Sequence, residues 1–152
     1  MVDSESCPPQ ITLAFPIGEK DFFMAGESAS KVKSTLQQLG LRQDIIKRVA
    51  IIIYEAAMNV VIHASYGQLE VHVDPEAISV QTEDVGAGIP DIDLAMQEGY
   101  STASDEIREM GFGAGMGLPN IKQCSDELSV ESKVSKGTKL KAKVYFTSKA
   151  YA

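Results

Sequence analysis

Glu55, Asn59 and His63 occupy every fourth position of a segment whose apolar residues have the spacing of a helix. Because positions four apart lie on one side of a helix, these three side chains are expected to form a polar stripe. A carboxylate and an amide oxygen one turn apart suit Mg²⁺, which prefers oxygen ligands and keeps some of its waters. A solvated polar face explains the stripe equally well, and His63 alone is more often a capping or packing residue than a catalyst.

The segment Asp84-Val85-Gly86-Ala87-Gly88 follows an alternating apolar run and is the second candidate for chemistry. An aspartate at the end of a strand can accept a hydrogen bond from an exocyclic amine. Gly86 and Gly88 would let the flat face of a ligand approach the backbone. A tight turn that needs positive φ is the structural alternative for both glycines.

A glycine-rich segment, residues 111–117, precedes a predicted helix. Its glycines stand at alternate positions, Gly111, Gly113, Gly115 and Gly117. Such a segment exposes backbone N–H groups, and together with a helix N-terminus it can bind phosphate groups. A flexible linker would have a similar composition, and the spacing fits neither a Walker A loop nor a dinucleotide-binding unit. A fourth motif, Gly137-Thr138, is by itself only a hairpin turn.

The composition indicates one globular domain. The chain has 152 residues, of which 44% are hydrophobic and 23% charged, close to the average of globular proteins. These values exclude a mostly disordered, collagen-like or disulfide-stapled chain. The net charge of −7, from 14 basic and 21 acidic residues, argues against binding a nucleic-acid backbone, which needs clustered Lys and Arg. It does not argue against binding one nucleotide.

The cysteines and the N-terminus give no indication of a metal site or of export. Cys7 and Cys124 are far apart, so we expect no zinc or redox motif, but a tail thiol and a buried apolar residue, respectively. Residues 1–10 lack the basic and apolar parts of a signal peptide and are interpreted as a flexible tail. The longest apolar run, residues 49–53, is too short to span a bilayer. We therefore expect a cytoplasmic protein without membrane contact.

Hydrophobic periodicity predicts the elements that position these motifs. The strongest prediction is a helix over residues 42–64, whose apolar residues recur three and four positions apart. Other helices are predicted from Ser28 or Ser30 to Leu39, over 92–97 and over 118–125. Strands are predicted over 11–15, 21–24, 68–73, 77–83, 128–134 and 138–146, with turns at 16–18 and 135–137 and a long loop over 99–116. This order predicts a two-layer α+β sandwich, with helices on one face of a mixed, mainly antiparallel sheet, and a single domain over 11–148.

In this order and in these contexts, the four motifs resemble the ATP-binding domain of gyrase, heat-shock chaperone, histidine-kinase and mismatch-repair ATPases. This is the GHKL superfamily, which has the Bergerat fold. Residues 55–59 match its N-box and residues 84–88 its G1 box. Residues 111–117 match its G2 box, and Gly137-Thr138 matches its final glycine-threonine motif. The similarity covers residues 20–146 and implies a site for ATP and Mg²⁺.

The resemblance implies roles for individual residues. Asn59 would coordinate Mg²⁺ at the ATP phosphates, and Glu55 would be the general base for an attacking hydroxyl or water. Asp84 would bind the adenine amino group, and Thr138 would support Asp84 or a bridging water. The adenine and ribose would lie against Gly86 and Gly88. The phosphates would be bound by Gly111, Gly113, Gly115 and Gly117.

Two further residues are left with open roles. His63 either polarises Glu55 or caps its helix near Gly67. Arg108 belongs to the expected lid over residues 99–116 and either reaches a phosphate or is solvated. A metal ligand, N–H donors and a lid are the parts that phosphoryl transfer needs, because it depends mostly on positioning and on neutralising phosphate charge.

The length of the chain favours the small stand-alone branch of the superfamily, the anti-sigma factors and switch serine/threonine kinases. Residues 83–102 are especially similar to the switch kinases, whereas residues 103–110 make the following loop longer than in those kinases. The implied function is a regulatory serine/threonine kinase that phosphorylates a small anti-sigma antagonist protein, with a sigma factor as a further partner. A homodimer is compatible with the resemblance.

Two other interpretations stay open at this point. In the first, the chain is a non-catalytic binding module, in which ATP orders the lid and the lid holds a regulatory partner. In the second, the chain is an α+β domain with glycine turns and no nucleotide. The second interpretation requires the four motifs to coincide by accident.

Overall fold

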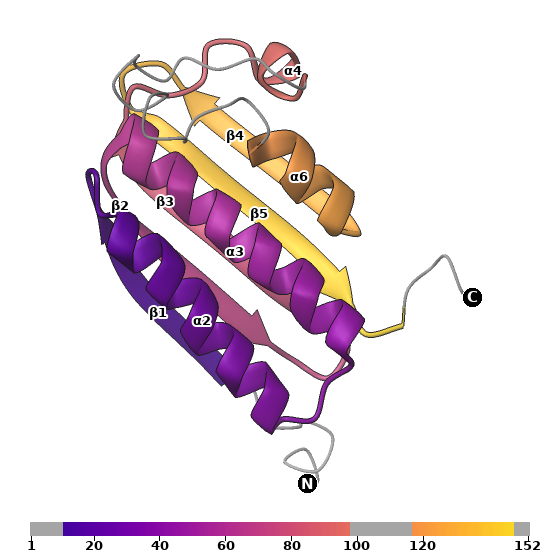
Figure 1. The fold of residues 1–152 in the computed structure, drawn as a ribbon. Coiled ribbons are helices and arrows are strands. Elements are labelled where there is room, and N and C mark those ends of the chain that lie inside the picture. The colour runs from indigo at the N-terminus through magenta and orange to yellow at the C-terminus, as the bar shows by residue number, and fades with distance from the viewer. Residues whose placement is uncertain (1–10, 98–116, 148–152) are drawn as a thin grey trace, which may run out of the picture.

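The computed structural model describes residues 11–97 and 117–147, which form a layer of helices on a sheet (Figure 1). The five strands lie in the order β1-β2-β3-β5-β4, and each neighbouring pair is antiparallel. The strands are β1 Ile11–Gly18, β2 Ala64–Val73, β3 Ala77–Gly86, β4 Glu127–Lys133 and β5 Gly137–Tyr145. The predicted α+β fold with a mainly antiparallel sheet is confirmed.

The helices are α2 Phe22–Gln38, α3 Gln43–His63, α4 Ile92–Ala95 and α6 Gly117–Cys124. Helices α2, α3 and α6 lie on the same face of the sheet, as predicted (Figure 1). Helix α3 agrees with the helix predicted over residues 42–64 to within one residue at each end. Within the described ranges, no helix has both the length and the apolar character needed to cross a membrane.

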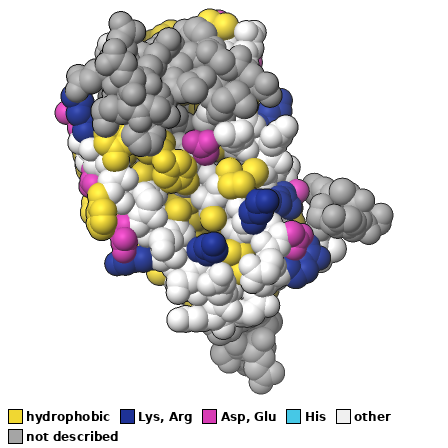
Figure 2. Space-filling view, in the orientation of Figure 1, with side chains coloured by type: hydrophobic (Ala, Val, Ile, Leu, Met, Phe, Trp, Pro, Cys, Tyr) yellow, Lys and Arg dark blue, Asp and Glu magenta, His cyan; other side chains and the backbone are white. Residues whose placement is uncertain are grey.

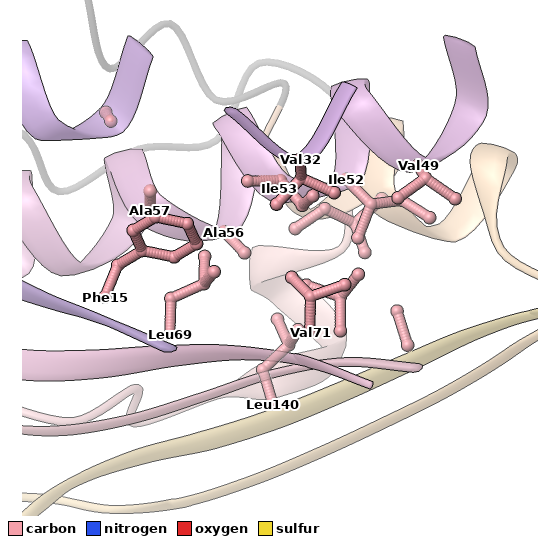
Figure 3. Packing of buried hydrophobic residues seen from close by; sticks show 14 of the residues in the cluster. Phe15, Val32, Val49, Ile52, Ile53, Ala56, Ala57, Leu69, Val71 and Leu140 are labelled. Atoms are coloured by element: carbon pink, nitrogen blue, oxygen red, sulfur yellow. The ribbon is translucent and has the colours of Figure 1, made fainter. Parts of the chain in front are cut away.

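Helix α3 is the centre of the hydrophobic core. Its buried residues are Ile45, Ile46, Val49, Ile52, Ile53, Ala56, Ala57, Met58, Val60 and Val61. Most of them recur three or four positions apart, so they form the side of the helix that packs on the sheet. Figure 3 shows side chains of α3 packed over Leu69, Val71 and Leu140 of the sheet. Burial of one large aliphatic side chain contributes about 1.5–3 kcal/mol, so this contact anchors α3 firmly.

Residues of the strands alternate between two environments. Leu69 and Val71 of β2 are buried beneath the helices, whereas Gln68 and Glu70 on the same strand are exposed. This alternation follows from the two-residue repeat of a strand and leaves one face of the sheet to solvent. On the opposite, helix-bearing side of the molecule, basic side chains are interspersed with acidic and apolar ones (Figure 2).

An ion pair ties α3 to the segment that joins α6 to β4. The Arg48 guanidinium lies 3.0 Å from the Asp126 carboxylate, and its Nε donates to the backbone oxygen of Cys124 at 2.8 Å. Asp126 also accepts a hydrogen bond from the backbone N–H of Tyr145 at 2.8 Å. Both charged side chains are largely shielded from solvent. The contacts fix the C-terminal end of α6 relative to α3 and to β5.

The strand predicted over residues 21–24 is wrong, because this segment begins helix α2. Asp21 is the N-cap of the helix, and its carboxylate accepts a hydrogen bond from the backbone N–H of Met24 at 3.1 Å. An N-cap carboxylate satisfies one of the N–H groups that lack a partner in the first turn. Ser28 and Ser30, the two alternative starts predicted for this helix, lie inside α2. Ser28 is buried there and donates to the backbone oxygen of Ala25.

Other element boundaries differ from the predicted ones. Strand β1 runs through Pro16 to Gly18 instead of turning at residue 16, which an edge strand allows because Pro lacks only a donor. Strand β2 begins at Ala64, four residues earlier than predicted, and α4 ends at Ala95, two residues earlier. Cys124 is half-buried rather than buried. The predicted loop 99–116 and Cys7 lie outside the described residues.

Replacement of the α2 cap tests its contribution to stability. Asp21→Ala removes the acceptor for the Met24 N–H, so we expect the free energy of unfolding to fall by about 1 kcal/mol. Asp21→Asn keeps a side-chain oxygen at the cap and is expected to unfold like the wild type. Urea denaturation followed by circular dichroism measures both values. Equal destabilisation by the two substitutions would contradict a capping role.

Candidate functional site

Helix α3 presents Glu55 and Asn59 on the side that does not pack on the sheet, and both side chains are half-buried. Helix α6 covers this part of α3. The amide Nδ2 of Asn120 donates a hydrogen bond of 2.7 Å to Oε2 of Glu55. At the start of α6, a Cβ added to Gly117 would lie 3.3 Å from Oδ1 of Asn59. Successive turns of α3 therefore contact the first turn of α6.

The packing of α6 explains why these residues face α3. Leu118 and Ile121 are buried in the core, and Gly117 and Asn120 precede each of them by one residue. Residues three apart share a side of a helix, so burial of one pair directs the other pair toward α3. Sequence reasoning missed Asn120, although its position three residues after Gly117 was a usable indication.

Asp84 lies near the end of β3 and is half-buried. Its Oδ1 accepts a hydrogen bond of 3.0 Å from the backbone N–H of Thr138 on β5. Burial raises the pKa of Asp84, and the hydrogen bond from Thr138 opposes part of that rise. The neighbouring Gly137 allows this close approach, because a Cβ there would lie 2.0 Å from the backbone oxygen of Asp84.

Gly67 of β2 shows that Asp84 and α3 are neighbours. A Cβ added to Gly67 would lie 2.9 Å from Cβ of Asp84 and 2.9 Å from Cγ1 of Val60. Val60 follows Asn59 on α3. The ends of α3 and β3, the start of α6 and the β4–β5 hairpin thus gather at one end of the sheet, the upper end in Figure 1. The described parts of all four motifs lie there.

The turn after β3 is held by the hairpin between β4 and β5. The backbone N–H of Gly86 donates to the oxygen of Lys136 at 3.1 Å, and the N–H of Ser135 donates to the oxygen of Ala87 at 2.8 Å. The hydroxyl of Ser132 accepts from the N–H of Ile89 at 2.6 Å. It also lies 2.8 Å from the hydroxyl of Thr138. The backbone N–H of Thr138 therefore contacts Asp84. Its hydroxyl contacts Ser132, which in turn holds the turn at Ile89.

Gly86 and Gly88 have no room for a side chain, because the protein's own backbone lies where a Cβ would be. Their predicted contact with adenine and ribose stays a prediction. A Cβ on Gly86 would lie 2.7 Å from Cα of Ala64, and a Cβ on Gly88 would lie 2.3 Å from the oxygen of Lys133. Gly88 also has a φ of +77°, which glycine adopts without strain. Packing of the turn against β2 and the hairpin is thus sufficient to require glycine at both positions.

His63 ends α3, and desolvation lowers the pKa of its imidazole. In the described part of the chain, the side chain that hydrogen-bonds Glu55 is that of Asn120, not that of His63. Residues Arg108, Gly111, Gly113 and Gly115 lie outside the described residues, and their predicted roles stay predictions.

Residues 44–148 match the family of histidine kinase-, DNA gyrase B- and HSP90-like ATPases. The chain belongs to this family. The Bacillus subtilis serine/threonine-protein kinase RsbT is 31% identical over 114 residues, which cover 72% of this chain and 80% of RsbT. The anti-sigma F factor of Clostridium kluyveri is 32% identical, over 77% of this chain and 82% of its own. The resemblance to the small anti-sigma and switch-kinase branch is confirmed.

A solved structure shows the same fold. The crystal structure of the SiaB-SiaC complex from Pseudomonas aeruginosa contains a chain that superposes with a TM-score of 0.59. The superposition covers 87% of this chain and 88% of that chain, at 15% sequence identity. At this level of identity the comparison supports the architecture alone. The two-layer arrangement of this ATPase-family chain is therefore also found in a chain of low sequence identity.

The described residues of this ATPase-family chain fit the nucleotide and metal that its motifs imply. Oδ1 of Asn59 faces the start of α6, where backbone N–H groups of a first turn lack helical partners and favour anions. A neutral amide oxygen is an acceptable ligand for Mg²⁺. Asp84, at the same end of the sheet, retains one carboxylate oxygen for an exocyclic amine, because Thr138 uses the other. Each group thus has the donor or acceptor that its expected ligand needs.

The raised pKa of Asp84 predicts a pH dependence of stability. Because the folded chain holds the Asp84 proton more tightly than the unfolded chain, ionisation favours unfolding. As the pH rises above about 3.9, the wild type should lose stability relative to Asp84→Asn until Asp84 is ionised in both states. Urea denaturation at a series of pH values measures the difference.

Asp74 provides a control of opposite sign. Desolvation alone would raise the pKa of Asp74. Hydrogen bonds from the N–H groups of Glu76 and Ala77 outweigh it, so the pKa of Asp74 is lowered. The wild type should therefore lose stability relative to Asp74→Asn as the pH falls below about 3.9. A difference between wild type and Asp84→Asn that is independent of pH would contradict the burial argument.

Proposed function

We propose that this chain is an ATP-dependent serine/threonine kinase that phosphorylates a small antagonist protein and so regulates a sigma factor. The observation that carries the proposal is the pair Glu55 and Asn59, one turn apart on α3 and against the first turn of α6. The names of its relatives, a serine/threonine-protein kinase and an anti-sigma F factor, support the same conclusion. The proposed setting is the cytoplasm, where ATP and such partners meet.

In the proposed reaction, Asp84 binds the adenine amino group through its free carboxylate oxygen. Asn59 holds Mg²⁺, which neutralises phosphate charge when it is bound. Glycines of the segment 111–117 contact the phosphates through backbone N–H groups, and Gly117 starts the helix that favours an anion. These groups hold ATP by adenine at one end and by phosphate at the other. Positioning and electrostatic stabilisation supply most of the catalysis in phosphoryl transfer.

Glu55 is the proposed general base. It accepts the proton of a serine or threonine hydroxyl of the antagonist as the hydroxyl oxygen forms a bond to the γ-phosphorus. The bond between that phosphorus and the β,γ-bridging oxygen breaks, and ADP leaves. A positioned base contributes a factor of about 10² to 10⁴ to such a rate.

Nucleotide binding is tested first by calorimetric titration with ATP and Mg²⁺. We expect saturable binding of ATP to the wild type. In Asp84→Asn the affinity for ATP should be weaker by about tenfold or more, because the adenine amine loses a charged acceptor. Chelation of Mg²⁺ should weaken binding further. Asp44→Asn, with the same loss of charge at the opposite end of α3, is the control and should bind like the wild type. Equal affinity in Asp84→Asn would overturn the adenine assignment.

Phosphate transfer is tested with labelled ATP and a panel of small antagonist proteins from the same genome. We expect labelled serine or threonine on one antagonist, and a loss of between about 10²-fold and 10⁴-fold in rate with Glu55→Gln. ATP affinity should be unchanged in Glu55→Gln, because the base does not bind the adenine. ATP binding and complex formation without transfer would favour the non-catalytic binding module instead.

A further inference from the structure

The hydrogen bond between Asn120 and Glu55 joins two residues that are 65 positions apart in the sequence. The amide Nδ2 lies 2.7 Å from Oε2, and both side chains are half-buried. From this contact we infer that Asn120 is a positioning residue, which holds the Glu55 carboxylate in the orientation that accepts the substrate proton. The inference rests on the proposed function, since it assigns a partner to the proposed base.

The orientation of Asn120 is itself fixed by the packing of α6. Leu118 and Ile121, two residues before and one residue after it, are buried in the core. At the end of α6, Nε of Arg48 holds the backbone oxygen of Cys124. Since α6 is held to α3 at both ends, the amide group has little freedom to leave Glu55. A donor whose position is fixed by packing loses less entropy when it forms a hydrogen bond.

A neutral donor is the suitable partner for a general base. The amide of Asn120 binds one carboxylate oxygen and leaves the other free to accept a proton. It carries no charge that would hold the carboxylate in an ion pair, and its N–H group is too weakly acidic to transfer a proton to Glu55. The chemistry of Asn120 therefore suits a partner that orients the base at Glu55.

The same helix also links the base to the proposed metal ligand. Gly117 faces Asn59, and Asn120, three residues later, faces Glu55, four residues before Asn59. Contacts on successive turns set the register of α6 along α3. The base and the metal ligand thus keep one relative position, which transfer in a fixed geometry requires.

The closing experiment measures kcat and KM for phosphate transfer in Asn120→Ala and in Asn120→Asp. Asn120→Ala removes the donor, and Asn120→Asp keeps the shape of the side chain but opposes one carboxylate with another. We expect kcat to fall by between about tenfold and about 10²-fold in both variants, with KM for ATP and the calorimetric ATP affinity unchanged. Gln123→Ala, an exposed residue of the same helix, is the matched control and should retain the wild-type kcat.

The outcomes separate positioning from a structural role. A contact that only holds the helices together would raise KM and lower stability to urea together with kcat, whereas a positioning contact lowers kcat alone. Wild-type kcat in Asn120→Asp, or equal losses of kcat and ATP affinity in Asn120→Ala, would overturn the inference and leave the kinase proposal standing. Absence of transfer by the wild type to every antagonist would overturn the kinase proposal, and the positioning role with it.

Discussion

The burial of α3 on the sheet is the interaction on which the rest of the structure depends. One side of this helix supplies a large part of the core, including Ile52, Ile53 and Val60. Because that side is committed to the sheet, Glu55 and Asn59 must lie on the remaining side, where α6 meets them. Moving the apolar pattern by one residue would rotate both polar side chains away from α6. The packing of the core therefore determines the geometry of the candidate site.

The antiparallel order of the sheet explains why distant motifs meet at one end. Strand β5 lies between β3 and β4, so the hairpin that begins β5 reaches the end of β3. Thr138 then contacts Asp84 across a sequence separation of 54 residues. The four motifs are short and individually unspecific, and the sheet gives them a shared location. This shared location is what gives their combination its meaning.

The sequence predicted those features that depend on repeated local patterns. Helix α3 was predicted nearly to its ends, because its apolar spacing continues over many turns. The strand predicted at residues 21–24 was wrong, because one short apolar run has too few residues to distinguish the two periods. The cap at Asp21 decided the outcome. The contact of Asn120 with Glu55 was missed for another reason, since it depends on how α6 packs against α3.

The polar stripe on α3 illustrates how packing resolves an ambiguity that sequence alone leaves open. A stripe that only faced solvent would leave its side chains exposed, as Lys47 on the same helix is. Glu55 and Asn59 are instead half-buried against α6, and burial of polar groups costs free energy unless they are paired. Asn120 offsets that cost for Glu55 with a short hydrogen bond. Asn59 is covered by the same helix, because its Oδ1 lies 3.3 Å from the position that a Cβ on Gly117 would occupy. Packing against α6 therefore distinguishes Glu55 and Asn59 from a stripe that only faces solvent.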